Sequence, residues 1–183
     1  MPIEIIYPRF KSGVFCGIGE KMVEIIKMTE NELADCTEIW NSVVEDGNSF
    51  PQLEVLDLAA ARDFFGSQSY TGAAIITEGN EVAGVYILHP NNVGRCGHIC
   101  NASYAVKKNR RGMHIGEAMV RDCIKKGKEL GFKILQFNAV VKSNNAALAL
   151  YKKLGFKQLG IIPDGFMLKT GEYEDIIPHY IEL

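Results

Sequence analysis

The sequence predicts an α/β fold arranged around a mixed sheet. Segments of strand content and of helical period follow one another as strand, two helices, three or more strands, helix, strand, helix and paired strands. The 183 residues are 47% hydrophobic, which suits a globular domain with its own core and excludes general disorder. No repeat, low-complexity run or linker divides the chain. We therefore expect an N-terminal extension over residues 1–21 and a single domain over residues 22–183.

Composition narrows the classes of partner. A net charge of −2 does not favour binding to nucleic acid or to an anionic membrane. No apolar run is long enough to cross a bilayer, and the N-terminus lacks the charged-then-apolar pattern of a signal peptide. Five cysteines, an odd number without a C-x-x-C pair, suit reduced thiols. We expect a cytoplasmic protein with no nucleic-acid and no membrane partner.

The first half of the domain begins with a strand over residues 22–28. Thr29, followed three residues later by Glu32, has the pattern of a helix N-cap. The helix after it carries an apolar face at helical spacing, made of Leu33, Cys36, Ile39, Trp40 and Val43. A second helix is expected over residues 53–65, ending at Gly66.

The middle of the chain is predicted to form a hairpin and a further strand. Residues 71–77 and 81–88 flank the turn Glu78-Gly79-Asn80, and residues 96–106 form the next strand. In the second half we expect a strand over residues 133–141 and a helix over residues 144–154. Shorter strands are then predicted over residues 157–162, 166–169 and 173–183, with Asp164-Gly165 as a turn.

Residues 102–116 are the most informative stretch. A strand over residues 102–106 runs through a basic turn into a helix whose apolar face extends from Gly116 to Leu130. The first N–H groups of such a helix, with Arg110 and Arg111 beside them, would favour an anion such as phosphate. A basic turn before an ordinary amphipathic helix explains the same residues equally well.

Two motifs resolve this ambiguity. Arg111-x-x-His114-x-Gly116 resembles motif A, [QR]-x-x-G-x-[GA], of the GNAT superfamily of acyl-CoA-dependent N-acyltransferases. Residues 144–156 resemble its motif B, N-x-x-A-x-x-L-Y-x-x-x-G-F. The resemblance covers residues 22–183 and implies the GNAT fold, a mixed, mostly antiparallel sheet flanked by helices. His114 stands where the family usually has a glycine, so its ring would either narrow the pyrophosphate site or add a donor.

The resemblance also implies the cofactor and its contacts. Acetyl-CoA would be the co-substrate, with its pyrophosphate on the motif A loop and its pantetheine arm paired with the end of the preceding strand. Tyr151 would be the general acid beside the sulfur, although without the motif it would be read as a packed aromatic. Asn144 would hold the pantetheine arm, cap its helix, or both. The implied cofactor contacts are Tyr104, Ala105, Val106, Arg111, Gly112, Met113, His114, Ile115, Gly116, Glu117, Asn144, Ala147 and Tyr151.

Two strand asparagines are candidate contacts for the acceptor amine. Residues 94–102 and 136–138 look like a GNAT subgroup that includes acetyltransferases of proline analogues, in which the residues matching Asn101 and Asn138 contact a small amino acid. The alternative is that these amides are buried and satisfy each other or the sheet. Cys100 stands near the place of the glutamate base of many members, so either a water chain takes the proton or the amine arrives neutral. Cys96-x-His98-x-Cys100 lacks a fourth ligand, and we expect no metal.

The predicted function is transfer of an acetyl group from acetyl-CoA directly to the amino group of a small metabolite or amino acid. No cysteine has an evident base beside it, which favours transfer without an acyl-enzyme. Two alternatives stay open at this point, a protein or peptide N-acetyltransferase and a non-catalytic CoA-binding sensor. A homodimer is possible in such folds.

Overall fold

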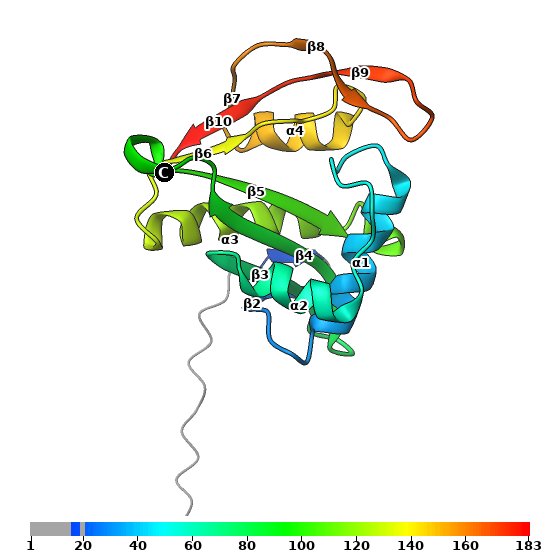
Figure 1. The fold of residues 1–183 in the computed structure, drawn as a ribbon. Helices are drawn as coiled ribbons and strands as arrows, with labels where there is room; N and C mark the ends of the chain where they lie inside the picture. Colours follow the sequence, from blue (N-terminus) through cyan, green and yellow to red (C-terminus); the bar gives the residue numbers. More distant parts are fainter. Residues whose placement is uncertain (1–15, 19–20) are drawn as a thin grey trace, which may run out of the picture.

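The computed structural model describes residues 16–18 and 21–183 and shows one large sheet with helices on both faces (Figure 1). The sheet has eight strands in the order β1-β2-β3-β4-β5-β6-β10-β7, and β8 and β9 form a separate two-stranded sheet. The strands are β1 (Cys16–Ile18), β2 (Lys21–Lys27), β3 (Tyr70–Ile76), β4 (Glu81–Pro90), β5 (Ile99–Val106), β6 (Ile134–Phe137), β7 (Lys157–Gln158), β8 (Ile162–Met167), β9 (Tyr173–Ile176) and β10 (His179–Glu182). The helices are α1 (Leu33–Asp46), α2 (Leu58–Gly66), α3 (Ile115–Glu129) and α4 (Asn145–Lys153).

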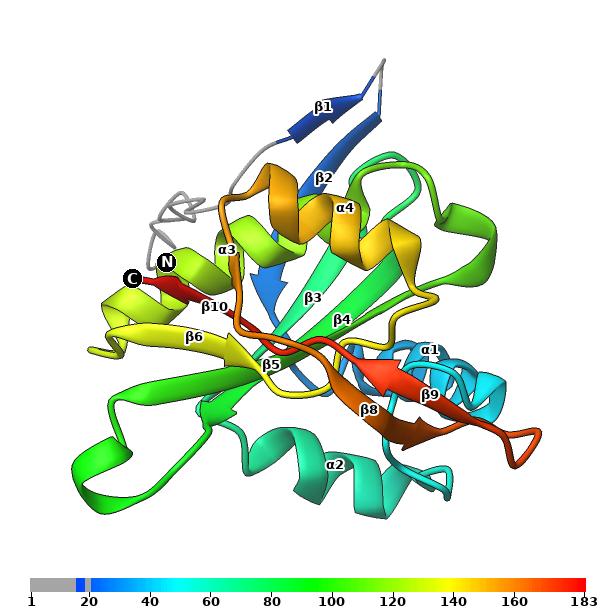
Figure 2. The same cartoon turned by 90° about the horizontal axis from the view of Figure 1, so that it is seen from above.

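The sheet is mixed, as predicted. β5 and β6 run parallel, whereas the other neighbouring strands of the large sheet are antiparallel. Helix α3 packs its buried residues on one face of the sheet with α4 beside it, and α1 and α2 cover the other face (Figure 2). Apolar side chains line both interfaces, so the sheet is buried from two sides. In the described part of the chain, the helices are too short or too polar to cross a membrane.

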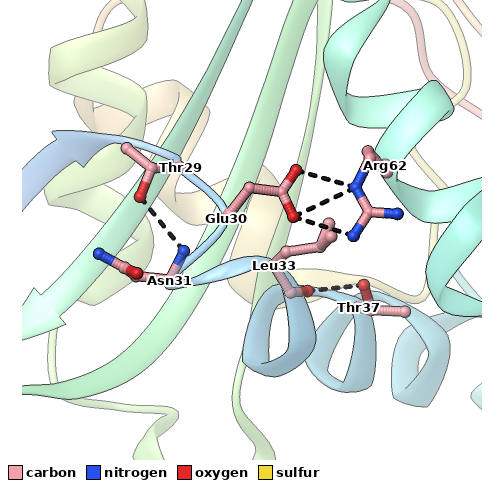
Figure 3. Close-up of polar contacts among 6 residues, drawn as sticks. All are labelled: Thr29, Glu30, Asn31, Leu33, Thr37 and Arg62. Atoms are coloured by element: carbon pink, nitrogen blue, oxygen red, sulfur yellow. Dashed lines mark hydrogen bonds and ion pairs between the residues drawn. The ribbon is translucent and has the colours of Figure 1, made fainter.

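Helix α1 begins at Leu33, not directly after Thr29. The Glu32 carboxylate accepts hydrogen bonds from the Thr29 N–H and hydroxyl, both at 2.8 Å, so the predicted pairing exists but closes a separate turn. Figure 3 shows Thr29, Glu30 and Asn31 of this segment and the ion pair of Glu30 with Arg62 of α2. The Arg62 Nε lies 2.9 Å from the Glu30 carboxylate. More than half of each side chain in that ion pair is exposed, so it contributes little to stability.

Helix α2 also starts later than predicted, at Leu58. Asp57 is its N-cap and accepts from the Ala60 N–H at 2.8 Å. Before it, the Asn41 amide binds both backbone groups of Leu56, while Leu53 is 84% exposed. The apolar residues of this segment therefore belong to an irregular loop and do not continue the helix.

The remaining differences lie in the strands. β5 begins at Ile99 because residues 94–96 form a 3₁₀ turn, and β6 ends at Phe137. β7 is only two residues long, and β8 runs through the predicted turn, with Asp164 at φ 51° where the register shifts. The last predicted strand is divided at Pro178 into β9 and β10, because proline lacks the N–H that a ladder needs. Most of the predicted extension, residues 1–21, lies outside the described residues. Its described part consists of β1, which pairs with β2, and Lys21, at which β2 begins.

Candidate active site

Strands β5 and β6 diverge, and this divergence creates the site. β5 pairs with β4 from Cys100 to Val106, but with β6 only at Ile99 and Cys100. The Lys107 N–H donates to Ala83, so odd-numbered residues of β5 bond toward β4 and even-numbered ones face the gap. The backbone groups of Tyr104 and Val106 therefore face the opening with no strand beside them in the described chain. An extended ligand could pair with them as an added strand does.

A cavity of about 680 Å³ lies against this free edge. It is bounded by β5 and by the N-terminal ends of α3 and α4. Its lining includes eleven of the residues predicted to contact the cofactor, namely Tyr104, Val106, Arg111, Gly112, His114, Ile115, Gly116, Glu117, Asn144, Ala147 and Tyr151. Two others do not line it. Ala105 is buried on the α1 and α2 side, and Met113 packs into the core under α3.

The loop before α3 has the backbone that an anion site requires. Gly112 has φ 80°, and His114, the residue that caps α3, has φ 54°. Both values lie in the left-handed region, which glycine adopts without strain. This explains why the family motif usually has a glycine where His114 stands. For histidine this conformation costs roughly 1–2 kcal/mol. The free N–H groups of the first turn of α3 border the cavity and favour a bound anion.

The cations of the basic turn are held by carboxylates. Arg110 forms a two-point ion pair with Glu81, at 2.6 Å and 3.1 Å, and Lys107 joins it at 3.0 Å. These contacts, Arg110 first, lower the pKa of Glu81 to about 2. Arg111 approaches Asp46 at 3.4 Å. The turn is thus a fixed charge arrangement, in which Arg111 remains half-exposed beside the cavity.

Glu117 connects the two motif helices. Its buried carboxylate accepts from Lys153 of α4 at 2.7 Å and from Arg121 at 2.8 Å, and lies 3.4 Å from the His114 ring. Lys153 and then Arg121 lower its pKa to about 2. Because these cations neutralise it, Glu117 can line a site for an anion, where a free carboxylate would repel the ligand.

A second, smaller cavity of about 230 Å³ adjoins the first. The two share Ser49, Tyr104, Asn144, Ala147 and Tyr151, so they meet inside the strand divergence. The smaller cavity is also lined by Asn101 and Asn138 from the sheet side, and by Phe50 and Pro51. Among the described residues that line it there is no aspartate, glutamate, lysine, arginine or histidine.

The loop after α1, which carries Ser49 to Pro51, was not predicted residue by residue. Its position depends on a contact far away in sequence. Lys169, at the β8–β9 turn, donates through its N–H to Gly47 and through its amine to Glu45. Gly47 has φ 61°, and a side chain there would collide with Lys169. The polar run of residues 46–49 before Pro51 indicates a loop, and the resemblance implies that this region covers one side of the acceptor site.

Tyr151 lies where the two cavities meet. Its ring packs on Phe137 at 4.5 Å and on Phe156 at 5.3 Å. Burial raises the pKa of its hydroxyl, so the phenol stays protonated and can act as a donor. The Tyr104 hydroxyl nearby is buried without a conventional hydrogen bond, because only the weakly bonding Cys123 thiol lies beside it. Burial raises its pKa as well.

Three asparagines predicted to contact the substrates, Asn144, Asn101 and Asn138, line the cavities. The Asn144 side chain accepts from the Ala147 N–H at 3.2 Å and lines both cavities, which is consistent with both predicted roles. Asn101 and Asn138 line the smaller cavity. The alternative was that these amides are buried and satisfy each other or the sheet. Half-buried Asn101 does bond to the backbone of its own strand, whereas Asn138 is exposed and bonds to Asn91.

Cys100, which stands near the place of the glutamate base of other family members, is a buried thiol. The buried Cys100 thiol donates to the Ile134 carbonyl, and burial raises its pKa to about 12. It is therefore no substitute for a carboxylate base.

Across residues 23–183 no group of three or more candidate ligands could hold a metal ion.

Comparison with known proteins identifies the family of this chain. A sequence model of the Acetyltransferase (GNAT) family matches residues 33–156. N-acetyltransferase aca1 of Schizosaccharomyces pombe is 32% identical over 152 residues, which are 80% of this chain and 64% of the relative. Protein SPT10 of Saccharomyces cerevisiae is 28% identical over 86 residues, 47% of this chain and 13% of that protein. The chain thus spans less than two thirds of the length of these curated relatives.

Solved structures extend the comparison over the whole fold. A GCN5-related N-acetyltransferase from Kribbella flavida has a TM-score of 0.80 and 27% identity, covering 88% of this chain and 98% of its own. A phosphinothricin acetyltransferase from Sinorhizobium meliloti, solved in complex with acetyl-CoA, has a TM-score of 0.81 and 18% identity, covering 88% of both chains. At that identity the second likeness concerns the fold alone.

Proposed function

Because this chain belongs to the GNAT acetyltransferase family, we propose that it transfers the acetyl group of acetyl-CoA to the amino group of a small metabolite or amino acid. One observation carries the proposal. The gap between β5 and β6 joins a large cavity beside a helix N-terminus to a small uncharged cavity, and Tyr151 stands at their junction. A long anionic thioester fits the first, and a small amine fits the second.

The residues of the large cavity suit acetyl-CoA. The N-terminal amides of α3 and the half-exposed Arg111 would bind the pyrophosphate. The unpaired backbone edge at Tyr104 and Val106 would bind the pantetheine amides. The acetyl-CoA named with the Sinorhizobium meliloti structure, which shares this fold, supports this assignment.

Where the two cavities meet, the chain supplies a hydrogen-bond donor for each negative charge that develops during transfer, one on the thioester oxygen and one on the leaving sulfur. The Tyr104 N–H faces the gap and would donate to the thioester oxygen. The neutral amine attacks the carbonyl carbon, the carbon–sulfur bond breaks, and the Tyr151 hydroxyl gives its proton to the leaving sulfur. The proton that the acylated nitrogen loses returns through water to the Tyr151 oxygen. Burial raises the pKa of Tyr151, so its hydroxyl is protonated at neutral pH and can serve as the donor.

The small cavity offers no side-chain base, because its described lining residues carry no carboxylate and no imidazole. The amine must therefore arrive neutral or lose its proton to water. We expect kcat/KM to rise with pH up to the acceptor amine's own pKa, and to shift with that pKa between acceptors. The same midpoint near neutrality for every acceptor would indicate a base on the enzyme and contradict this account.

The experiment that tests the function is thioester loss from acetyl-CoA, followed by absorbance, with amino acids, proline analogues, polyamines and peptides as acceptors. The expected result is turnover with small free amines. Acetylation of peptides alone would replace the small-acceptor proposal by a protein N-acetyltransferase. Tight acetyl-CoA binding without turnover on any acceptor would instead favour a CoA-binding sensor.

A further inference from the structure

His114 is the residue at which the loop before α3 departs from the family motif, and its backbone conformation makes that departure unfavourable. Among the described residues, the non-glycine residues with positive φ are Asn80, His114 and Asp164. Asn80 lies in the turn before β4, and Asp164 lies where the register of β8 shifts. His114 instead caps α3 and lines the large cavity. A strained residue at a binding site points to a role for its side chain.

The two ring nitrogens of His114 have different surroundings. Nδ1 lies 3.4 Å from Oε2 of Glu117, a carboxylate that Lys153 and Arg121 also contact. These cations, Lys153 first, lower the pKa of Glu117 to about 2, so its negative charge is present throughout the neutral range. More than half of the His114 side chain is exposed. Nε2 is therefore the ring nitrogen left for a ligand in the large cavity.

A neutral imidazole ring suits only one of two neighbouring anions. One of its nitrogens carries the proton, and the other presents a lone pair. The Glu117 carboxylate favours the proton on Nδ1, which leaves the lone pair of Nε2 to face a bound pyrophosphate and repel it. With the proton on Nε2, the lone pair of Nδ1 would face Glu117. Only the imidazolium, which is protonated on both nitrogens, is attracted by both anions.

We propose that His114 binds the pyrophosphate of acetyl-CoA as an imidazolium, and that the ring takes up a proton from solvent when the cofactor binds. The inference rests on the proposed function. Of the two roles that the sequence leaves open for this ring, narrowing the site or adding a donor, it selects the second. Histidine suits this role because it is the type of side chain that titrates between pH 5 and pH 8.

The other charged groups around this cavity keep their charge in that range. The other titratable residues among its described lining are Tyr104, Arg110, Arg111, Glu117 and Tyr151. Arginine stays protonated, burial raises the pKa of both tyrosine hydroxyls, and the carboxylate is already ionised.

Further charges lie behind the lining and are paired with it. Glu81 of β4 holds Arg110, and Asp46 of α1 holds Arg111. Lys153 of α4 and Arg121 of α3 hold Glu117. A proton that is taken up on binding is therefore assigned to His114.

The test measures proton uptake on binding and needs no acetyl transfer. Dephospho-coenzyme A is titrated by calorimetry into the full chain at about pH 7.5, in Hepes and in Tris, whose ionisation enthalpies differ. The two observed enthalpies differ in proportion to the protons that binding takes up, so they give the number of those protons. This ligand keeps the pyrophosphate and lacks the 3′-phosphate, whose own titration would otherwise contribute.

The decisive variant is His114→Asn. Asparagine tolerates a positive φ, keeps a hydrogen-bond donor and does not titrate. The matched control is His98→Asn, the same substitution in an exposed histidine before β5 that lines neither cavity. Thermal unfolding without ligand checks that the variants are folded. If His114→Asn is unfolded, His114→Gly, which relieves the backbone strain, takes its place with the same expected outcomes.

We expect wild type and His98→Asn to take up between about half a proton and one proton per ligand, and His114→Asn to take up almost none. Protonation favours binding, so the affinity is highest at low pH and falls as the pH rises. Kd of wild type should increase about three- to tenfold from pH 7 to pH 8, the slope that this uptake requires. Kd of His114→Asn should be higher than that of wild type at pH 7 and change little.

Binding by wild type without proton uptake, or with an uptake that persists in His114→Asn, would overturn the inference and leave the cofactor site in place. Tighter binding by His114→Asn than by wild type across this pH range would also overturn it, because the ring would then narrow the site. If wild type binds neither acetyl-CoA nor dephospho-coenzyme A, the proposed function fails, and the inference fails with it.

Discussion

Tyr151 is the side chain on which the proposed chemical step depends. Its protonated hydroxyl lies between the two cavities, and its ring is fixed by Phe137 and Phe156. Tyr151→Phe keeps this packing and removes the proton donor. We expect kcat to fall about a hundredfold or more, with acetyl-CoA affinity retained. Steady-state kinetics and calorimetry measure the two quantities.

Tyr173 provides the control for that variant. It is an exposed tyrosine on β9, away from both sets of cavity-lining residues. Tyr173→Phe should leave kcat unchanged. Equal activity of Tyr151→Phe and wild type would remove Tyr151 as the acid and assign protonation of the sulfur to solvent.

His114 stores backbone strain at the anion site. With φ 54° it occupies a conformation that glycine adopts without cost. His114→Gly should raise the free energy of unfolding by about 0.5–1 kcal/mol. This value is the strain that the substitution relieves minus the cost of ordering a glycine, which is more flexible in the unfolded chain. Urea denaturation measures this change, with Gly112→Ala, at φ 80°, expected to destabilise. A loss of stability in His114→Gly would mean that the contact of the ring with Glu117 outweighs the strain.

Among the elements, α3 and α4 are joined by the contacts of Glu117 with Lys153 and Arg121. Its pKa of about 2 in the folded protein lies below the ordinary value of 4.5. The stabilisation is therefore present above about pH 4.5 and is lost as the pH falls toward 2. Glu117→Gln should be less stable than wild type near pH 7, and the difference should shrink on acidification.

Thermal unfolding between pH 7 and pH 3 measures that difference. Glu54→Gln, in an exposed residue of the loop before α2, is the control and should follow wild type throughout. A constant difference between Glu117→Gln and wild type at all pH values would show that the charge of Glu117 contributes nothing and that only its packing matters.

The elements also show how far the sequence can be interpreted without a structure. The hairpin turn at Gly79 and Asn80 has the positive φ values that its residues predict, and Gly131 ends α3 at φ 86°. These are local signals. The start of α1 was misplaced because the Thr29–Glu32 pair, which resembles a helix cap, closes a separate turn. The start of α2 was misplaced because apolar residues continue into a loop that Asn41 holds. The last predicted strand, residues 173–183, is divided because Pro178 cannot donate to a ladder.

For the site, the motifs predicted most of the residues that line the large cavity, because those residues are close together in sequence. The partners that set charge and orientation were not predictable. Glu81 for Arg110, Asp46 for Arg111 and Asn91 for Asn138 come from distant elements that only the folded sheet brings together.

For the molecule as a whole, the cofactor would bridge the diverging strands and both motif helices. Binding only to the folded state stabilises a protein by about 2.7 kcal/mol at a ligand concentration a hundredfold above Kd. For a chain of this size we expect acetyl-CoA to raise Tm by roughly 5–10 °C under that condition. Pantetheine, which lacks the pyrophosphate that α3 would bind, should give a smaller shift at the same concentration. Differential scanning fluorimetry compares them, and equal shifts would contradict the assignment of the α3 N-terminus to pyrophosphate.

Direct transfer between two bound substrates is the central claim, and its most direct measurement is a single-turnover experiment with excess protein. Acetyl-CoA is added with and without a small amino acid, and free coenzyme A, acetylated product and the intact mass of the protein are recorded together. The account predicts coenzyme A and N-acetylated product in equal amounts, only when both substrates are present, with the protein mass unchanged. Release of coenzyme A without the amino acid, or an acetyl group left on the protein, would contradict it.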